Sequence, residues 1–319
     1  MKRTLIFSLT GLLLVVLGTI LYLNFESNKA NNSTELISQN VSSSSRTNSL
    51  SKEQGSKIDG MTYTTTYDGK EYNKEALVYV PDSYETGKPM NILYLMHGSG
   101  MSAEQVAADV KPLLDNWIAN GDIEPLLVVF PTYYPDRSFV VSNYSADYPL
   151  NHYFAETEVL EVMKTVESQY TTFAETADET GFTASRSHRA FGGYSMGGIT
   201  TWDVLVEQSD KFFYYMPMAG DSWIGQVTGR NSDEAIAETL VSGLQENNYG
   251  QNDFQIIAMV GGSDGTKYSM IPQIEALRSN HSDLITGDNL IYWENNGGGH
   301  NQESFELEIQ HGLTYLFKE

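Results

Sequence analysis

The sequence predicts an α/β fold in which a mainly parallel central sheet has helices on both faces. Past residue 60, short apolar segments typical of strands alternate with longer segments of helical periodicity. Several apolar segments, such as 126–130, are continuous, which is the pattern of strands buried on both faces. In such a sheet ligands bind beyond the carboxyl ends of the strands. The residues directly after each strand are therefore the functional candidates.

The elements follow one another regularly along the chain. The first two strands are rich in Thr, Tyr and Val, and a turn at Asp68-Gly69 joins them. Strands are expected at 61–67, 76–81, 91–96, 126–130, 189–194, 212–218, 255–260 and 290–293. Helices are expected at 103–120, 157–170, 196–207 and 303–317, where apolar residues recur at helical spacing.

Composition limits the possible partners and chemistries. The 319 residues include 41 acidic and 19 basic side chains, for a net charge of −22. Such a surface repels phosphate backbones, so nucleic acid is not an expected partner. The chain has no cysteine, which excludes disulfides, thiolate metal sites and a cysteine nucleophile.

The sequence of the N-terminus predicts a membrane segment. Lys2 and Arg3 precede an uncharged run at 4–23, and twenty residues of helix span about 30 Å, the thickness of a bilayer core. Residues 1–25 are therefore expected to be an uncleaved anchor or a cleaved signal, and the basic end places the rest of the chain outside the cytoplasm. The sequence Asn28-Lys29-Ala30 is a poor cleavage site, which favours the anchor.

A stalk is expected between this segment and the folded domain. Residues 26–59 contain ten serines and few large apolar side chains. Such a stretch cannot bury enough surface to offset its ordering entropy, so it is expected to be disordered. The folded domain is then expected at 60–319.

The five residues Gly193-Tyr194-Ser195-Met196-Gly197 read G-x-S-x-G between a predicted strand and a predicted helix. A serine that attacks an ester stands exposed on a sharp strand-to-helix turn with strained backbone angles. Strand and helix then approach so closely that the positions two before and two after the serine must be small. The pattern predicts that Ser195 is the nucleophile of an acyl transfer.

A nucleophilic serine needs donors for the oxyanion that forms on its substrate. The loop His97-Gly98-Ser99-Gly100 follows the strand at 91–96. A glycine-containing loop at this point offers one backbone N–H, and the residue after the nucleophile offers another. Ser99 and Met196 are therefore the expected donors, both through their amides. His97 is expected to stiffen the loop by hydrogen bonding.

The acid and the base follow later strand ends. His300 stands behind three glycines after the strand at 290–293 and is the expected base. Asp264 follows the strand at 255–260, and Asp221 follows the strand before it. Both aspartates satisfy the order serine, acid, histidine, but the position after the penultimate strand favours Asp264.

Other sites are less sharply indicated. The chain has no His-Glu-x-x-His motif, EF-hand spacing or dinucleotide loop, so no metal and no cofactor are expected. Serine-dependent hydrolysis needs none. Tyr133, Tyr134, Asp221 and Trp223 follow strands and are candidates for contacting the substrate, with packing inside the cleft as the alternative for the aromatic residues.

These strand-end motifs resemble those of the feruloyl and acetyl xylan esterases of the esterase D-like group, which is carbohydrate esterase family 1 of the α/β-hydrolase superfamily. The Ser-Met-Gly-Gly elbow and the Gly-Gly-Gly-His loop carry most of the resemblance, and 217–223 looks like the family segment that lines the active-site cleft. The resemblance covers roughly residues 60–319. It implies an α/β-hydrolase fold and assigns nucleophile, acid and base to Ser195, Asp264 and His300.

The resemblance implies a serine carboxylic-ester hydrolase that removes feruloyl or acetyl groups from plant cell-wall polysaccharide such as xylan. Some relatives have tryptophan just after the catalytic histidine, where this chain has Asn301-Gln302, so no ring is expected to stack there. Two other functions stay open. One is an esterase or deacetylase acting on the cell envelope, which surface anchoring would suit. The other is a surface binding module without turnover, against which the complete Ser, Asp and His set argues.

Overall fold

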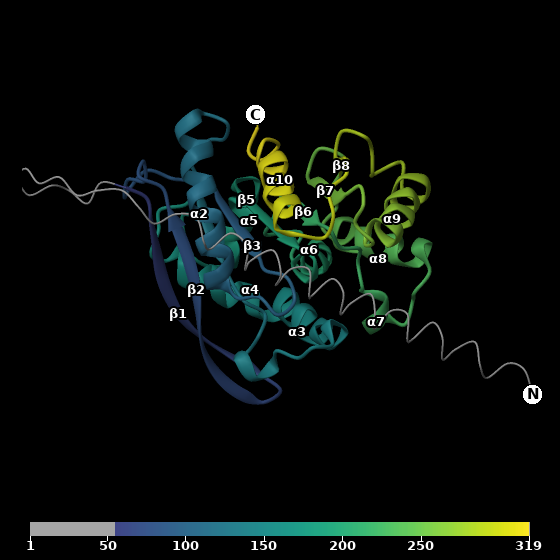
Figure 1. The fold of residues 1–319 in the computed structure, drawn as a ribbon, viewed down its shortest axis with the longest axis horizontal. Coiled ribbons are helices and arrows are strands. Elements are labelled where there is room, and N and C mark those ends of the chain that lie inside the picture. The colour runs from purple at the N-terminus through teal and green to yellow at the C-terminus, as the bar shows by residue number, and fades with distance from the viewer. Residues whose placement is uncertain (1–54, 319) are drawn as a thin grey trace, which may run out of the picture.

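The computed structural model describes residues 55–318, in which eight strands form one sheet with helices packed on both faces (Figure 1). The strand order across the sheet is β1-β2-β4-β3-β5-β6-β7-β8. The pairs β1–β2 and β2–β4 are antiparallel, and the other pairs are parallel. The predicted α/β fold with a mainly parallel sheet is confirmed.

The predicted strands are all present. They are β1 (Lys57–Tyr67), β2 (Lys70–Val80), β3 (Ile92–Met96), β4 (Leu127–Phe130), β5 (Arg189–Tyr194), β6 (Tyr214–Met218), β7 (Gln255–Gly261) and β8 (Leu290–Asn295). The α-helices are α2 (Ala103–Asn120), α3 (Tyr148–Tyr153), α4 (Val159–Glu167), α5 (Glu179–Ala184), α6 (Met196–Glu207), α7 (Gly225–Thr228), α8 (Asp233–Glu246), α9 (Lys267–Asn280) and α10 (Gln302–Leu313). Short 3₁₀ turns lie at η1 (Arg137–Phe139), η2 (Tyr144–Asp147) and η4 (Arg186–His188).

The domain begins slightly earlier than expected. β1 starts at Lys57 rather than at residue 60, because it pairs with β2 from Lys57 to Tyr67. The hairpin turn lies at Asp68-Gly69 as predicted, with φ of 47° and 72°. The predicted anchor at 1–25 and the first part of the predicted stalk lie outside the described residues. Within 55–318, no helix combines the length and apolarity needed to cross a bilayer.

Strand order decides which face each helix covers. Connections between parallel strands are right-handed, so the covering helix changes face when the chain reverses its direction along the sheet. α2 connects β3 to β4 in one direction, and α6 connects β5 to β6 in the other. Consequently α2 and α10 share one face, while α4, α6 and α8 cover the opposite face (Figure 1).

The reversal places β3 and β5 side by side, with Met96 paired to Gly193. Ligands of open α/β sheets bind at such a switch point, beyond the carboxyl ends of the strands. The loop at 97–101 and the turn at Ser195 leave the sheet here. The fold therefore brings the two strand ends that matter most for the predicted chemistry next to each other.

The helix predicted at 157–170 differs from the observed one. α3 continues into a π-helical turn, η3 (Phe154–Glu158), and α4 then ends at Glu167. Glu158 is buried and accepts hydrogen bonds from Tyr63 (2.5 Å) and Lys74 of the β1–β2 hairpin. Because this polar residue occupies the buried face, the apolar periodicity is interrupted where the helix begins.

The amino end of the sheet is held by a fully bonded charge cluster. Arg189 is buried and donates through Nε and Nη2 to the two oxygens of Glu167, each at 2.8 Å. Its remaining N–H groups reach the carbonyls of Phe182 and Lys211 and the Ser185 hydroxyl at 2.8–3.0 Å. All five donors of the guanidinium are thus used.

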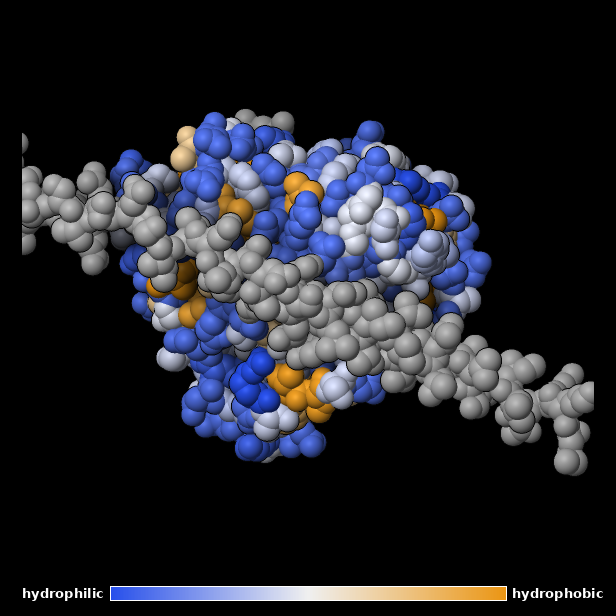
Figure 2. All heavy atoms as spheres, in the orientation of Figure 1, coloured by the Kyte–Doolittle hydropathy of each residue, from blue (hydrophilic) through white to orange (hydrophobic). Residues whose placement is uncertain are grey.

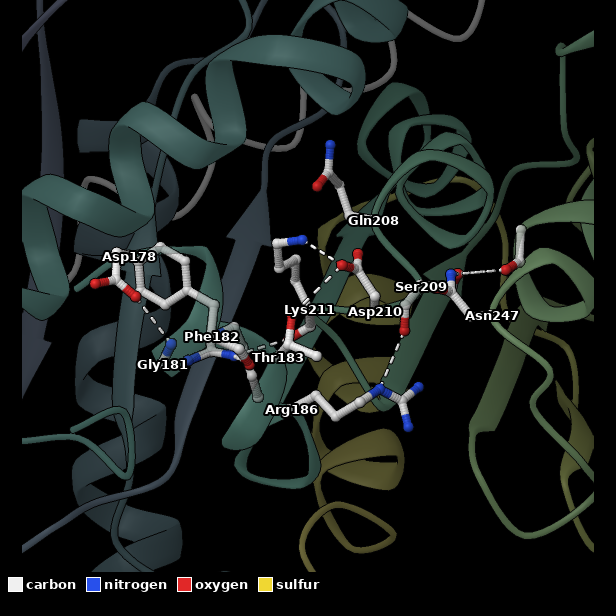
Figure 3. A network of polar contacts seen from close by, with 12 residues as sticks. Asp178, Gly181, Phe182, Thr183, Arg186, Gln208, Ser209, Asp210, Lys211 and Asn247 are labelled. Carbon is white, nitrogen blue, oxygen red and sulfur yellow. Dashed lines mark hydrogen bonds and ion pairs between the residues drawn. The ribbon is translucent and has the colours of Figure 1, made fainter. Parts of the chain in front are cut away.

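A second set of polar contacts extends this end of the molecule (Figure 3). Arg186 donates to the carbonyl of Ser209 at 3.1 Å, and Asn247 of the segment after α8 donates to the Ser209 hydroxyl at 2.9 Å. Lys211 pairs with Asp210. These contacts join η4, the segment after α6 and the residue that ends α8.

The visible surface is mostly hydrophilic, with apolar side chains only in small separate patches (Figure 2). One patch lies beside α3. Val141 and Tyr144, in the segment leading into α3, are 46% and 43% exposed.

Candidate active site

The turn at Ser195 has the geometry that the G-x-S-x-G pattern predicts. Ser195 joins β5 to α6 with φ 57° and ψ −117°, a region that side-chain-bearing residues rarely occupy. A Cβ on Gly193 would stand 2.5 Å from the carbonyl carbon of Gly197, and one on Gly197 would stand 2.3 Å from the oxygen of Met96. Any larger residue at either position would push the strand and the helix apart.

Three predicted site residues meet at this turn. His300 Nε2 lies 3.0 Å from Ser195 Oγ, and His300 Nδ1 lies 2.7 Å from Asp264 Oδ2. An ionised carboxylate only accepts hydrogen bonds, so Nδ1 carries the proton. Nε2 is then free to accept the hydroxyl proton of Ser195. The arrangement is that of a nucleophile, its base and an orienting acid.

Asp264 is built to stay ionised. Its other oxygen, Oδ1, accepts from the Thr266 amide at 2.9 Å and from the Thr266 hydroxyl at 2.8 Å. Burial raises the pKa of Asp264, but the interactions with His300 and Thr266 outweigh burial and hold the pKa below its usual range. The carboxylate therefore remains charged at neutral pH and faces the ring that takes up a proton during the reaction.

The turn that carries Asp264 and the loop that carries His300 are joined directly. The Gly262 amide donates to the carbonyl of Asn295, and the Ser263 amide donates to the carbonyl of Gly298, both at 2.7 Å. A Cβ on Gly261 would stand 2.5 Å from the Gly298 oxygen. The shared backbone hydrogen bonds thus fix the position of the acid relative to the base.

Asp221, the rival acid, lies elsewhere. No hydrogen bond joins it to His300, and burial raises its pKa to about 6. Its neighbour Gly220 packs against the turn at Ser195, since a Cβ on Gly220 would stand 2.7 Å from the backbone carbonyl oxygen of Ser195. Trp223 follows, half-buried, with its ring 5.9–6.1 Å from those of Tyr148 and Tyr144. The acid that hydrogen-bonds to His300 is therefore Asp264. Asp221 and Trp223 remain predicted substrate contacts.

The two expected oxyanion donors lie beside the nucleophile. A Cβ on Gly98 would stand 3.4 Å from the Cβ of Ser195, so the loop at 97–101 passes close to it. Met196 is the first residue of α6, whose initial amides have no partner within the helix. Within residues 55–318, the Ser99 and Met196 amides have no acceptor. Both can therefore donate to an oxyanion.

His97 stiffens the loop, as expected. It is fully buried, with Nδ1 2.8 Å from the Gly98 carbonyl and Nε2 2.7 Å from the Thr132 hydroxyl. Burial lowers its pKa to about 4, so the ring is neutral at physiological pH. Because a carbonyl only accepts, Nδ1 carries the proton and Nε2 accepts from Thr132.

Burial favours the packing alternative for Tyr133 and Tyr134, whose contact with substrate stays a prediction. The two side chains are only 0% and 2% exposed, and both hydroxyls donate to Asp147, at 3.1 and 2.7 Å. The residues do follow a strand, as reasoned, but the segment around η2 and α3 covers them. They support the loop at 97–101 from behind.

Sequence reasoning missed Asp147 and Asn151. Both are fully buried. Asp147 accepts a hydrogen bond from the Ser99 hydroxyl, and Asn151 donates one to the Met196 carbonyl. One usable signal was present, because the proline of Asp147-Tyr148-Pro149 marks a helix start. In the part of the chain that the structure covers, no group of three or more acidic or histidine side chains is placed to hold a metal.

Comparison with known sequences finds a curated relative. The chain is 36% identical over 223 residues to endo-1,4-beta-xylanase Y of Acetivibrio thermocellus. The match covers 69% of this chain and 19% of that protein, so the chain spans about a fifth of its relative. No family model matches the chain.

Solved structures of esterases are also similar to this chain. A mutant of the feruloyl esterase module from Clostridium thermocellum, complexed with sinapinate, matches with a TM-score of 0.69 and 33% identity, over 84% of this chain and 90% of that one. The ferulic acid esterase of Anaeromyces mucronatus matches at 0.62, over 85% and 94% of the two chains, but at 16% identity it supports the fold alone. On the first of these likenesses, which spans nearly all of both folded domains, the chain belongs to the carbohydrate esterase family 1 feruloyl esterases of the α/β-hydrolase superfamily.

Proposed function

We propose that this chain is a serine esterase that hydrolyses feruloyl esters of plant cell-wall xylan. The observation that carries the proposal is the hydrogen-bonded series Asp264–His300–Ser195, with distances of 2.7 and 3.0 Å, beside two amides without acceptors. Such a set serves acyl transfer and needs no cofactor.

The first half-reaction acylates the serine. His300 Nε2 takes the hydroxyl proton of Ser195 as Oγ bonds to the ester carbon. The carbonyl oxygen becomes an oxyanion and accepts from the amides of Ser99 and Met196. When the intermediate collapses, the bond from carbon to the sugar oxygen breaks, and His300 returns the proton to that oxygen. The sugar leaves and the acyl group stays on Ser195.

The second half-reaction releases the acid. His300 takes a proton from water, and the resulting hydroxide attacks the acyl carbon while the same two amides hold the oxyanion. Collapse breaks the bond to Oγ, which recovers its proton from His300. Asp264 keeps its charge throughout and stabilises the imidazolium in both halves.

The choice of a feruloyl group rests on the likeness to the xylanase and to the esterase module with sinapinate. A group of aromatic side chains on the segments after β6 and before α3 supports it. Trp223 is half-buried beside the rings of Tyr144 and Tyr148, and Tyr144 is 43% exposed. A flat hydroxycinnamoyl ring can stack on such side chains. Asn301 caps α10 by accepting from the Ser304 amide and offers no ring on the other side.

We place the reaction outside the cytoplasm. The expected anchor or signal at 1–25 would deliver the domain there, and acylated polysaccharide is found there. The net charge of −22 gives no electrostatic attraction to a neutral or acidic polymer. Recognition is therefore expected to depend on the acyl group and on hydrogen bonds to the sugar.

A substrate panel tests the proposal. Methyl ferulate, feruloylated arabinoxylan, acetylated xylan and an aryl acetate are incubated with the wild type and with Ser195→Ala, and the released acids are quantified. We expect kcat/KM to be highest for the feruloyl substrates and to fall by at least about 10⁴-fold in Ser195→Ala. Release of acetate alone would move the assignment to a deacetylase. Equal turnover by Ser195→Ala would overturn serine catalysis.

A further inference from the structure

One short stretch of chain touches both sides of the predicted oxyanion hole. Asp147 and Asn151 lie at the start of α3, which packs against α6. Both side chains are 0% exposed. Neither residue hydrogen-bonds to the Asp264–His300–Ser195 series, so the mechanism above does not explain why two polar side chains are buried here.

Asp147 holds the loop that carries Ser99. One oxygen, Oδ2, accepts from the Ser99 hydroxyl at 2.5 Å and from the hydroxyls of Tyr134 and Tyr133 at 2.7 and 3.1 Å. The Tyr134 hydroxyl in turn accepts from the Gly100 amide at 2.8 Å. The loop is therefore tied at two successive residues to one buried carboxylate.

The loop carbonyls are fixed as well. The Arg137 guanidinium donates to the carbonyls of Gly100 at 3.1 Å and Met101 at 2.7 Å, and the His97 ring donates to the carbonyl of Gly98. These contacts set the orientation of successive peptide planes and leave the Ser99 amide without an acceptor. The direction of that amide is thus determined by its neighbours.

Asn151 holds the other side. Its Nδ2 donates to the Thr200 hydroxyl at 2.7 Å and to the Met196 carbonyl at 3.3 Å. The Thr200 hydroxyl donates to the same carbonyl at 3.0 Å. Two donors therefore fix the carbonyl of the residue whose amide is the second expected oxyanion donor, and with it the first turn of α6.

Residues four apart on a helix lie on one face, about one turn from each other. We propose that Asp147 and Asn151 are positioning residues that act together from α3 to hold the amides of Ser99 and Met196 at the spacing an oxyanion requires. We call this pair, together with Tyr134 and the Ser99 side chain, the oxyanion brace. The two donors lie at the ends of different strands, so no covalent bond fixes the distance between them. The hydrogen bonds of the brace fix that distance instead.

The energetic reason is specific to the transition state. An oxyanion hole works when its donors already point to where the charge will form, so that nothing has to reorganise during the reaction. Loosening a donor therefore lowers kcat more than it raises KM. Burial raises the pKa of Asp147, and its hydrogen bonds from Ser99, Tyr134 and Tyr133 oppose that rise.

Because the brace acts on the oxyanion of an ester, the proposal rests on the proposed function. The experiment compares Tyr134→Phe, Ser99→Ala and Asn151→Leu with a matched control, Tyr94→Phe. Tyr94 is also buried and donates its hydroxyl to a buried carboxylate, that of Glu167, at 2.8 Å, but at the other end of the sheet. Ser99→Ala removes only the link to Asp147 and keeps the backbone amide.

For each variant we measure kcat and KM on an aryl ester, the Ki of a trifluoromethyl ketone that forms an oxyanion on Ser195, and the Tm. We expect kcat to fall by about tenfold to hundredfold in the three brace variants, with KM within about twofold and Ki raised by the same factor as kcat falls. Tyr94→Phe is expected to lower Tm while kcat and Ki stay at wild-type values.

The brace is overturned if its variants behave like Tyr94→Phe, with lower Tm and unchanged kcat and Ki. It is also overturned if kcat falls while Ki for the ketone does not change. Failure of the proposed function gives a different result, since the wild type would then turn over no ester, or Ser195→Ala would turn it over equally well. A variant too unstable to purify is replaced by its conservative partner, Ser99→Thr or Asn151→Gln, for which kcat and Ki are expected between those of wild type and those of the remaining brace variants.

Discussion

A buried glutamate lies towards each end of the sheet, and the two differ in whether their carboxyl oxygens have hydrogen-bond partners. At the amino end, Glu167 accepts hydrogen bonds from Arg189, Tyr94 and Thr172, all at 2.8 Å. Towards the carboxyl end, Glu308 of α10 is 0% exposed and neither of its oxygens has a partner. The Glu167 carboxylate is thus satisfied, while the Glu308 carboxyl group, which lies close enough to Asp264 to feel its charge, is not.

Other features follow the same division. The strained backbone of Ser195 and the buried unpartnered atoms of Asp147, Asn151 and Asn295 belong to the carboxyl-end side of the molecule. Strain and unsatisfied polar groups persist in a fold only where the surrounding structure holds them. We infer that the amino end supplies stability and that the carboxyl end uses it to hold a strained site.

The largest effect on stability is expected from Arg189→Met. This change leaves Glu167 buried with its ion pair removed, and breaking one half of a buried pair costs about 3–5 kcal/mol. Urea unfolding measures the free energy, and ester turnover at low temperature measures activity. We expect kcat to stay within about twofold of wild type. A large loss of kcat in the folded variant would break the division between the two ends.

A smaller effect of opposite sign is expected from Glu308→Gln. Burial, and then the charge of Asp264, raise the pKa of Glu308 from 4.5 to about 9. The folded state therefore keeps a proton that the unfolded state releases, and wild-type stability falls as pH rises from about 4.5 towards 9. Glutamine has nearly the same shape and no such proton. Each pH unit in this window corresponds to up to about 1.4 kcal/mol, so relative to wild type the variant should gain about 2–3 kcal/mol by pH 6.5 and more at pH 8.

Unfolding curves at pH 5, 6.5 and 8 measure this difference, with Glu303→Gln on the first turn of the same helix as the control. Glu303 is exposed, so its replacement should change stability by a similar small amount at every pH. A Glu308→Gln difference that does not grow with pH would mean that Glu308 is charged in the folded protein.

Much of this fold could be predicted from local patterns. The residues of β5, α2 and α6 agree with the prediction at both ends, because buried strands and capped helices leave strong local signals. Ser102 caps α2, and Gly121 ends it with φ 75°. α8 and α9 were not predicted. Gln273 occupies a buried position of α9, and a polar residue there weakens the apolar periodicity on which a helical prediction rests.

The candidate site divides in the same way. Ser195, Asp264 and His300 follow strands whose carboxyl ends share one edge, so chain order alone brought them together. Tyr133 and Tyr134 also follow a strand, but the later segment at 136–153 covers them. That segment has no periodic pattern, and the roles of Asp147 and Asn151 arise from contacts 45–49 residues away. Only the folded chain shows them.

The most direct measurement of the central account is labelling by a fluorophosphonate probe. The probe forms a covalent bond only with a serine activated by a base and held beside oxyanion donors. Wild type and His300→Ala are treated with the probe, digested and mapped by mass spectrometry. The account predicts one label, on Ser195, that His300→Ala loses. No label on folded wild-type protein, or a label on another serine, would contradict it.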